Sequence, residues 1–71
     1  MNYQKILNKA SNELQLKNLK SPKLDSELIL AKTLNVSREE SLLNLNKKID
    51  NSDLNEFNYY LNLRSNHKPI A

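Results

Sequence analysis

The hydrophobic positions at the start of the chain recur at three- and four-residue spacing, which predicts an amphipathic helix over residues 2–16. The residues on this face are Tyr3, Ile6, Leu7, Ala10 and Leu14. A second helix begins at Ser21-Pro22, because Ser can cap a helix and Pro suits its first position. It runs to about Leu34. Its main apolar stripe consists of Leu24, Leu28, Ala31 and Leu34, widened by Leu30, and Ile29 points away from it. A helix with apolar residues on more than one side is expected to be central in its bundle.

Two further helices are predicted after the Asn35-Val36 break. Ser37 and Glu40 form a capping box, which predicts a short helix that carries Leu42 and Leu43 and extends at most to Leu45. The last helix begins at Asp50 or Ser52, since either can cap it. One face carries Leu54, Phe57, Tyr60, Leu61 and Arg64, and leaves out Tyr59 and Leu63. Lys68-Pro69 is expected to end the helix, because the residue before Pro favours an extended conformation.

The pattern therefore predicts an all-α fold, a small bundle of four to five helices. The chain of 71 residues suffices for one domain, and its lack of Gly disfavours the tight turns of a β-rich fold. The predicted core consists of Ile6, Leu7, Ala10, Leu14, Leu24, Leu28, Ala31, Leu34, Leu42, Phe57 and Leu61.

Composition excludes several kinds of site. The chain has no Cys, and its single His67 has no second His beside it, so no metal site is predicted. Without a Gly-rich loop there is no phosphate or dinucleotide cradle, so we expect neither a cofactor nor a catalytic residue here. No run of about 18 apolar residues predicts a membrane span. The N-terminus lacks the apolar stretch of a signal peptide, so the expected compartment is the cytoplasm.

A helix-turn-helix is the main alternative that the residues offer. The segment from Ala31 to Arg38 has the small residue, turn and Val-Ser entry of such a motif. Glu39 and Glu40 would then face the phosphates, where negative charge repels. The net charge of +3 is mild and fits a solvated surface better than a nucleic-acid ligand, so binding to nucleic acid is not the favoured reading.

Residues 21–31 read SPKLDSELILA, and residues 34–38 read LNVSR. Near the end, Leu61 and Arg64 have the spacing L-x-x-R, and residues 68–71 read KPIA. These stretches resemble S-P-R-L-D-A-E-L-L-L-A, L-G-V-S-R, L-x-x-R and x-P-I-A of the HemK/PrmC family, which methylates the glutamine side chain of class 1 peptide chain release factors. Asn35 and His67 stand where the family often has Gly.

The resemblance implies a non-catalytic N-terminal helical domain over residues 1–67 that recognises the release factor. Residues 68–71 would begin the linker to a methyltransferase domain, which holds S-adenosylmethionine and the N-P-P-Y motif. The expected partners are the release factor and that methyltransferase domain, and a purely structural bundle is a further alternative. The parent would be the enzyme, since no N-P-P-Y occurs here.

Two sets of residues are candidates for specific contacts. Glu27 lies on the predicted inward side of its helix, where a carboxylate needs a partner; Arg64 is the first candidate for an ion pair and Arg38 the second. Ile29, Tyr59 and Leu63 lie off the main stripes and are candidates for a partner surface. Because Tyr59 and Leu63 lie just before residue 71, the methyltransferase domain is the preferred partner for this surface, ahead of the release factor.

Overall fold

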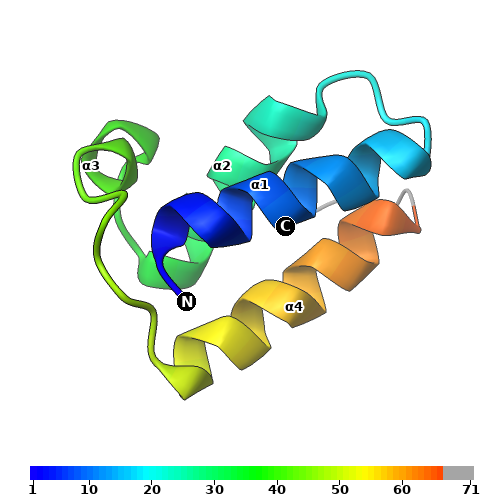
Figure 1. Cartoon of the computed structure of the whole chain (residues 1–71). Helices are drawn as coiled ribbons and strands as arrows, with labels where there is room; N and C mark the ends of the chain where they lie inside the picture. Colours follow the sequence, from blue (N-terminus) through cyan, green and yellow to red (C-terminus); the bar gives the residue numbers. More distant parts are fainter. Residues whose placement is uncertain (67–71) are drawn as a thin grey trace.

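In a computed structural model, residues 1–66 form four helices: α1 (Tyr3–Leu16), α2 (Pro22–Leu34), α3 (Arg38–Leu42) and α4 (Asn51–Ser65) (Figure 1). Within these 66 residues the only β-structure is an isolated bridge between Asn2 and Lys48. The predicted all-α bundle is therefore confirmed. The predicted helix stop at Lys68-Pro69 and the boundary after His67 lie outside the described residues.

Helix α2 is the central element of the bundle. It packs against each of the other three helices, whereas α3 packs against α2 alone. The three longer helices lie beside one another, and α3 sits at one end of the molecule (Figure 1). The central position predicted for the second helix is confirmed, and it explains why α2 carries apolar residues on several sides.

The buried side of α2 differs from the predicted stripe. Leu24 and Leu28 are 43% and 47% exposed, whereas Ile29 and Leu30 are fully buried. The stripe built on Leu24 and Leu28 was therefore wrong, and so was the outward position given to Ile29. Because α2 is apolar on several sides, the spacing of its leucines does not determine which side faces the core.

Two small polar residues mark the side of α2 that is buried. Ser26 and Thr33 flank Ile29 and Leu30 at helical spacing, and all four are buried. The Ser26 hydroxyl donates to the Lys23 carbonyl at 2.8 Å, and the Thr33 hydroxyl donates to the Ile29 carbonyl at 2.9 Å. Both hydroxyl groups thus donate their hydrogen bond within the helix, so burying Ser26 and Thr33 leaves no hydroxyl donor unpaired.

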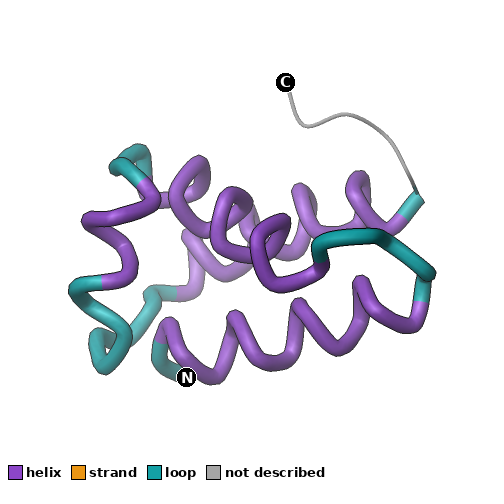
Figure 2. The backbone as a smooth tube through the Cα atoms, turned by 90° about the horizontal axis from the view of Figure 1, so that it is seen from above, coloured by secondary structure: helices purple, strands orange, loops and turns teal. Residues whose placement is uncertain are grey.

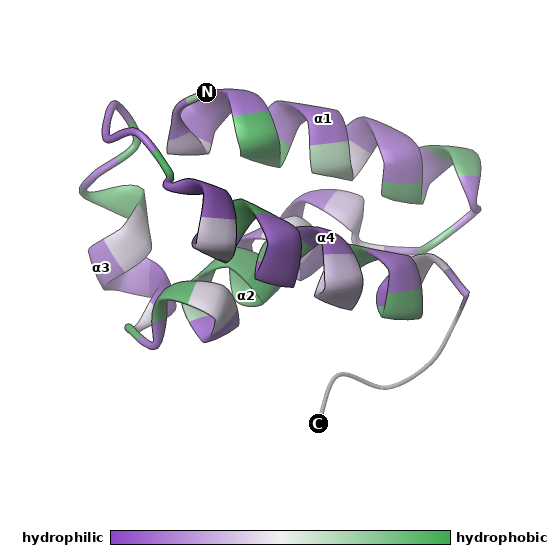
Figure 3. Ribbon diagram, turned by 90° about the horizontal axis from the view of Figure 1, so that it is seen from below, coloured by the Kyte–Doolittle hydropathy of each residue, from purple (hydrophilic) through white to green (hydrophobic). Residues whose placement is uncertain are grey.

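The remaining core follows the sequence pattern more closely. Seven predicted core residues are buried: Ile6, Leu7, Ala10, Leu14, Ala31, Phe57 and Leu61. Leu34 and Leu42 are partly buried and pack against the core, which also contains Tyr3. In Figure 3 the hydrophobic positions of α1 recur along the edge that faces the other helices.

The ends of α1 and α2 use Asn where Gly is usual. Asn35 has φ 57° and ψ 44°, a left-handed conformation that Asn tolerates better than other non-Gly residues. The N–H groups of Asn35 and Val36 donate to the carbonyls of Lys32 and Ala31 at 3.2 and 3.1 Å, which is the Schellman pattern. Helix α1 ends in the same way at Asn18, with φ 63°. Asn35 therefore preserves the turn in spite of the missing Gly.

The predicted helix starts are largely confirmed. The side chains of Ser37 and Asp50 each accept a hydrogen bond from the backbone N–H three residues later, at 3.1 and 2.9 Å. Asp50, not Ser52, is thus the cap of α4. At α2, Pro22 occupies the first turn as predicted, but the Ser21 side chain makes no capping hydrogen bond. Helix α3 is shorter than predicted, because it ends at Leu42 and leaves Leu43 and Leu45 in the following turn.

The segment after α3 is tied to the start of α1. The N–H groups of Tyr3 and Gln4 donate to the carbonyls of Lys47 and Leu45, both at 3.0 Å. Backbone N–H groups in the first turn of a helix have no carbonyl partner within that helix, and these two bonds supply partners for the N–H groups of Tyr3 and Gln4. Figure 2 shows this segment, in teal, beside the N-terminus. Leu45 is thereby held next to the first turns of α1.

Candidate functional site

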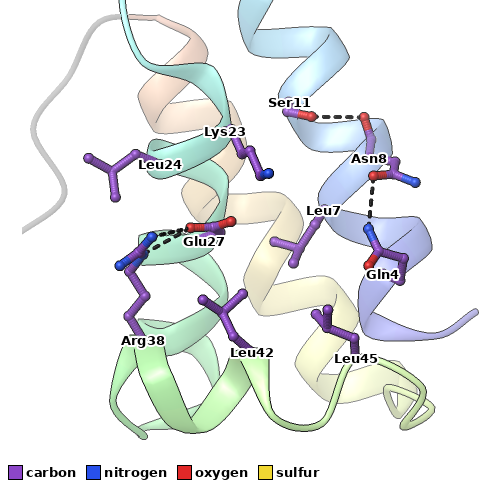
Figure 4. A pocket seen from close by; sticks show the side chains of 10 residues that line it. All are labelled: Gln4, Leu7, Asn8, Ser11, Lys23, Leu24, Glu27, Arg38, Leu42 and Leu45. Atoms are coloured by element: carbon purple, nitrogen blue, oxygen red, sulfur yellow. Dashed lines mark hydrogen bonds and ion pairs between the residues drawn. The ribbon is translucent and has the colours of Figure 1, made fainter.

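A groove lies between α1, α2 and α3, with a volume of about 770 Å³. It is lined by Gln4, Leu7, Asn8, Ser11, Lys23, Leu24, Glu27, Arg38, Leu42 and Leu45. In Figure 4, Leu7, Leu42 and Leu45 point into the space between the helices, and Lys23 and Leu24 lie on the α2 side. The groove thus combines an apolar lining with charged groups on one side.

An ion pair between α2 and α3 forms part of the groove wall. Arg38 donates to Oε1 of Glu27 from Nε at 2.9 Å and from Nη2 at 2.8 Å. The Glu27 side chain is 7% exposed and that of Arg38 39% exposed. The inward position predicted for Glu27 is confirmed, and the pair supplies the partner that a buried carboxylate needs.

The predicted pair between Glu27 and Arg64 is wrong. Arg64 instead binds Asp25, with Nη2 and Nε at 3.1 and 3.2 Å from Oδ2. Asp25 and Glu27 are two residues apart and so project from nearly opposite sides of α2. Asp25 lies on the side that meets α4, and Glu27 lies on the side that meets α3. Arg38, the second candidate in the sequence, is therefore the partner of Glu27.

A second surface lies on the side of α2 and α4 away from the groove. Asp25, Leu28, Lys32 and Arg64 line a shallow depression there. The amino group of Lys32 lies 5.4 Å from the centre of the Tyr60 ring, in a cation–π contact. The ring of Tyr59 packs against that of Tyr60, with centroids 5.5 Å apart. The cations on this surface thus already have partners.

The three residues proposed as a partner surface do not lie together in one exposed patch. Ile29 is fully buried and therefore cannot contact a partner. Tyr59 is 61% exposed and Leu63 is partly exposed, both on α4. Sequence reasoning missed Leu24 and Leu28 as surface residues. The sequence carries no signal for this, because Ser26 and Thr33, which lie on the buried side opposite Leu24 and Leu28, are residue types that are usually exposed.

Two titratable groups have altered pKa values, and neither lines the groove. Burial raises the pKa of the Tyr3 hydroxyl above its usual value, and the carboxylates of Asp53 and Asp50 add to the effect. The hydrogen bond from the Asp53 backbone lowers the pKa of Asp50, and the Ser52 hydroxyl lowers it further. Both Tyr3 and Asp50 lie near the start of α4.

Residues 1–66 hold no cluster of three or more His, Cys, Asp or Glu side chains that could bind a metal ion. The predicted tail His67 lies outside the described residues. Across the same 66 residues, no helix has the length and apolar character needed to cross a membrane.

Comparison with known proteins gives one match. The model of a family described as PrmC N-terminal domain matches residues 5–71. Neither the curated proteins nor the solved structures contain a match to the chain.

Proposed function

The chain belongs to the PrmC N-terminal domain family, and from this membership we propose that it is the non-catalytic N-terminal domain of a protein-(glutamine-N5) methyltransferase. In this proposal the domain binds a class 1 peptide chain release factor and positions it for methylation. The family match, which covers all but the first four residues, carries the proposal. Such a role places the protein in the cytoplasm.

A positioning role fits the chemistry that the domain can supply. Holding a protein substrate in one orientation lowers the entropic cost of the reaction, although the holding residues take no part in bond making. The groove offers leucine side chains beside charged groups, which is the mixture that protein interfaces use. The proposal therefore separates recognition in this domain from chemistry in the next.

The proposal assigns S-adenosylmethionine to the methyltransferase domain. The groove walls are formed by side chains of α1, α2, α3 and the turn after α3, and the chain contains no Gly. They do not match a Gly-rich loop, which presents unpaired N–H groups to a nucleotide-like ligand. We therefore propose residues 1–67 as the recognition domain and residues 68–71 as the start of the linker.

The surface of α4 is the proposed contact with the methyltransferase domain. Tyr59 is exposed, and Leu63 follows it one turn later on the same side of α4. In this proposal the linker at residues 68–71 follows α4 directly, which favours α4 as the helix that the methyltransferase domain contacts. Substituting both residues by Ser is expected to leave the domain folded and to weaken its binding to a separately produced methyltransferase domain. Loss of the fold in this variant would show that both residues belong to the core.

Isothermal titration calorimetry with a purified class 1 release factor tests the main proposal. We expect saturable heat with a Kd on the order of micromolar. The control is the Phe57→Asp variant, which places a charge in the core and removes the folded surface. No heat from the wild-type chain at concentrations well above micromolar would contradict the proposal.

Nucleic acid is the competing ligand in the same experiment. The residues after the α2–α3 turn include Glu39 and Glu40, both exposed in the first turn of α3, which disfavours contact with phosphates. Titration with unrelated DNA and RNA duplexes at several salt concentrations measures this alternative. Binding that falls steeply with salt and exceeds binding to the release factor would favour it.

A further inference from the structure

The groove between α1, α2 and α3 has an excess of positive charge. Lys23 and Arg38 line it, and Glu27 is the only acidic residue in its lining. The Glu27 carboxylate already forms a hydrogen bond and an ion pair with Arg38. Among residues 1–66, no carboxylate lies within ion-pair distance of Lys23. The groove therefore has a cation available for an acidic group of a partner.

The apolar part of the groove lies beside this charge. Leu7, Leu42 and Leu45 come from three different segments and point into the same space (Figure 4). Leu24 also lines the groove and is 43% exposed, but it projects from α2 away from these three side chains (Figure 4). An apolar side chain packed against Leu7, Leu42 and Leu45 would bring a neighbouring carboxylate near Lys23.

The depression lined by Asp25, Leu28, Lys32 and Arg64 lacks such an available charge. Leu28 lies there, four residues after Leu24, and so does Lys32, nine residues after Lys23. Both Leu28 and Lys32 are exposed. Lys32 is engaged over the Tyr60 ring, and Arg64 is paired with Asp25. Both surfaces have an exposed leucine and a lysine on the same helix, but only the groove leaves its lysine without a partner among the described residues.

We propose that the groove binds a segment of the release factor in which an apolar side chain is flanked by Asp or Glu. The apolar side chain packs against Leu7, Leu42 and Leu45, with Leu24 at the edge of the groove, and the carboxylate pairs with Lys23. Electrostatic complementarity of this kind raises the association rate and selects the partner. This inference rests on the function proposed above and specifies which surface performs it.

Matched substitutions on α2 test the assignment. Leu24→Asp and Lys23→Glu alter residues that line the groove, whereas Leu28→Asp and Lys32→Glu make the same changes at residues that line the second depression instead. All four residues are exposed, so the variants are expected to fold, which circular dichroism checks. We expect Leu24→Asp and Lys23→Glu to raise the Kd for a class 1 release factor about tenfold or more, and the two controls by less than about twofold.

The outcomes separate the groove assignment from the proposed function. Wild-type binding that survives both groove substitutions, or that the controls weaken equally, overturns the groove assignment and leaves the release factor as the partner. Absence of wild-type binding overturns both. Binding of an RNA duplex that is lost in Lys23→Glu but kept in Leu24→Asp assigns the charge to nucleic acid and also overturns the groove assignment.

Discussion

The guanidinium group of Arg38 holds the nearly buried carboxylate of Glu27, with both Nε and Nη2 directed at the same oxygen. This pair joins α3 to α2 across 11 residues of sequence. Because α3 packs against α2 alone, the ion pair is one of the few polar links that place this short helix. It also forms part of the groove wall, so stability and proposed recognition depend on the same contact.

A double-mutant cycle on Glu27 and Arg38 is expected to show a coupling free energy of about 1–2 kcal/mol. The value is below that of a fully buried pair because Arg38 is 39% exposed. The variants are Glu27→Gln, Arg38→Gln and the double substitution, and the measurement is urea denaturation. The matched cycle on Glu27 and Arg64 is expected to give a coupling near zero, because Arg64 binds Asp25. A larger coupling with Arg64 than with Arg38 would contradict the structure.

Neighbouring residues of α2 are expected to differ sharply in their tolerance to truncation. Ile29→Ala removes a fully buried side chain and is expected to lower the free energy of unfolding by about 2–5 kcal/mol. Leu28→Ala, at a residue that is 47% exposed, is expected to cost less than about 1 kcal/mol. Thermal or urea denaturation of the two variants side by side makes the comparison. Equal losses would show that the buried side of α2 is misassigned.

The left-handed conformation of Asn35 predicts that Gly at this position gives a more stable protein than Ala does. Asn35→Ala is expected to destabilise the chain by about 1 kcal/mol, because Asn tolerates the left-handed conformation at positive φ better than Ala does. Asn35→Gly is expected to be neutral or stabilising, since Gly adopts this conformation freely. The control is Asn12→Ala in the exposed part of α1, where Ala has the higher helix propensity and should not destabilise. Melting temperatures in the reverse order would contradict this account of the turn.

The lowered pKa of Asp50 predicts a dependence of stability on acid pH. The ionised side chain accepts the hydrogen bond of the Asp53 backbone, so the native state favours the charged form. Its contribution is present above the unfolded value of 3.8 and is lost as the pH falls through the lower pKa of the native state. The Asp50→Asn variant keeps a capping oxygen but does not titrate.

Melting temperatures of the wild type and Asp50→Asn are therefore compared between pH 6 and about pH 2. We expect the melting temperature of the wild type to fall further over this range than that of Asp50→Asn. The other carboxylates titrate equally in both proteins, so the difference reports the titration of Asp50. Parallel curves would show that Asp50 titrates alike in the native and unfolded states.

The sequence by itself determined the helices and most of their ends. Pro22 marks a helix start because its fixed φ and missing N–H suit the first turn. Ser37 and Asp50 mark helix starts through hydrogen bonds within a few residues, and Asn35 ends α2 through equally local bonds. Such signals need no knowledge of distant contacts, so they can be read along the chain. The buried face of α1 was equally clear, because apolar residues occupy one side of that helix.

The tertiary structure alone decided which side of α2 is buried and which arginine Glu27 meets. Helix α2 is apolar on several sides, so the packing of α1, α3 and α4 around it selected Ile29 and left Leu24 and Leu28 exposed. Arg38 and Arg64 both reach α2, and only the positions of α3 and α4 assign them to Glu27 and Asp25. Local spacing sets where a side chain lies on its own helix, whereas the neighbour that it meets depends on how the helices pack against one another.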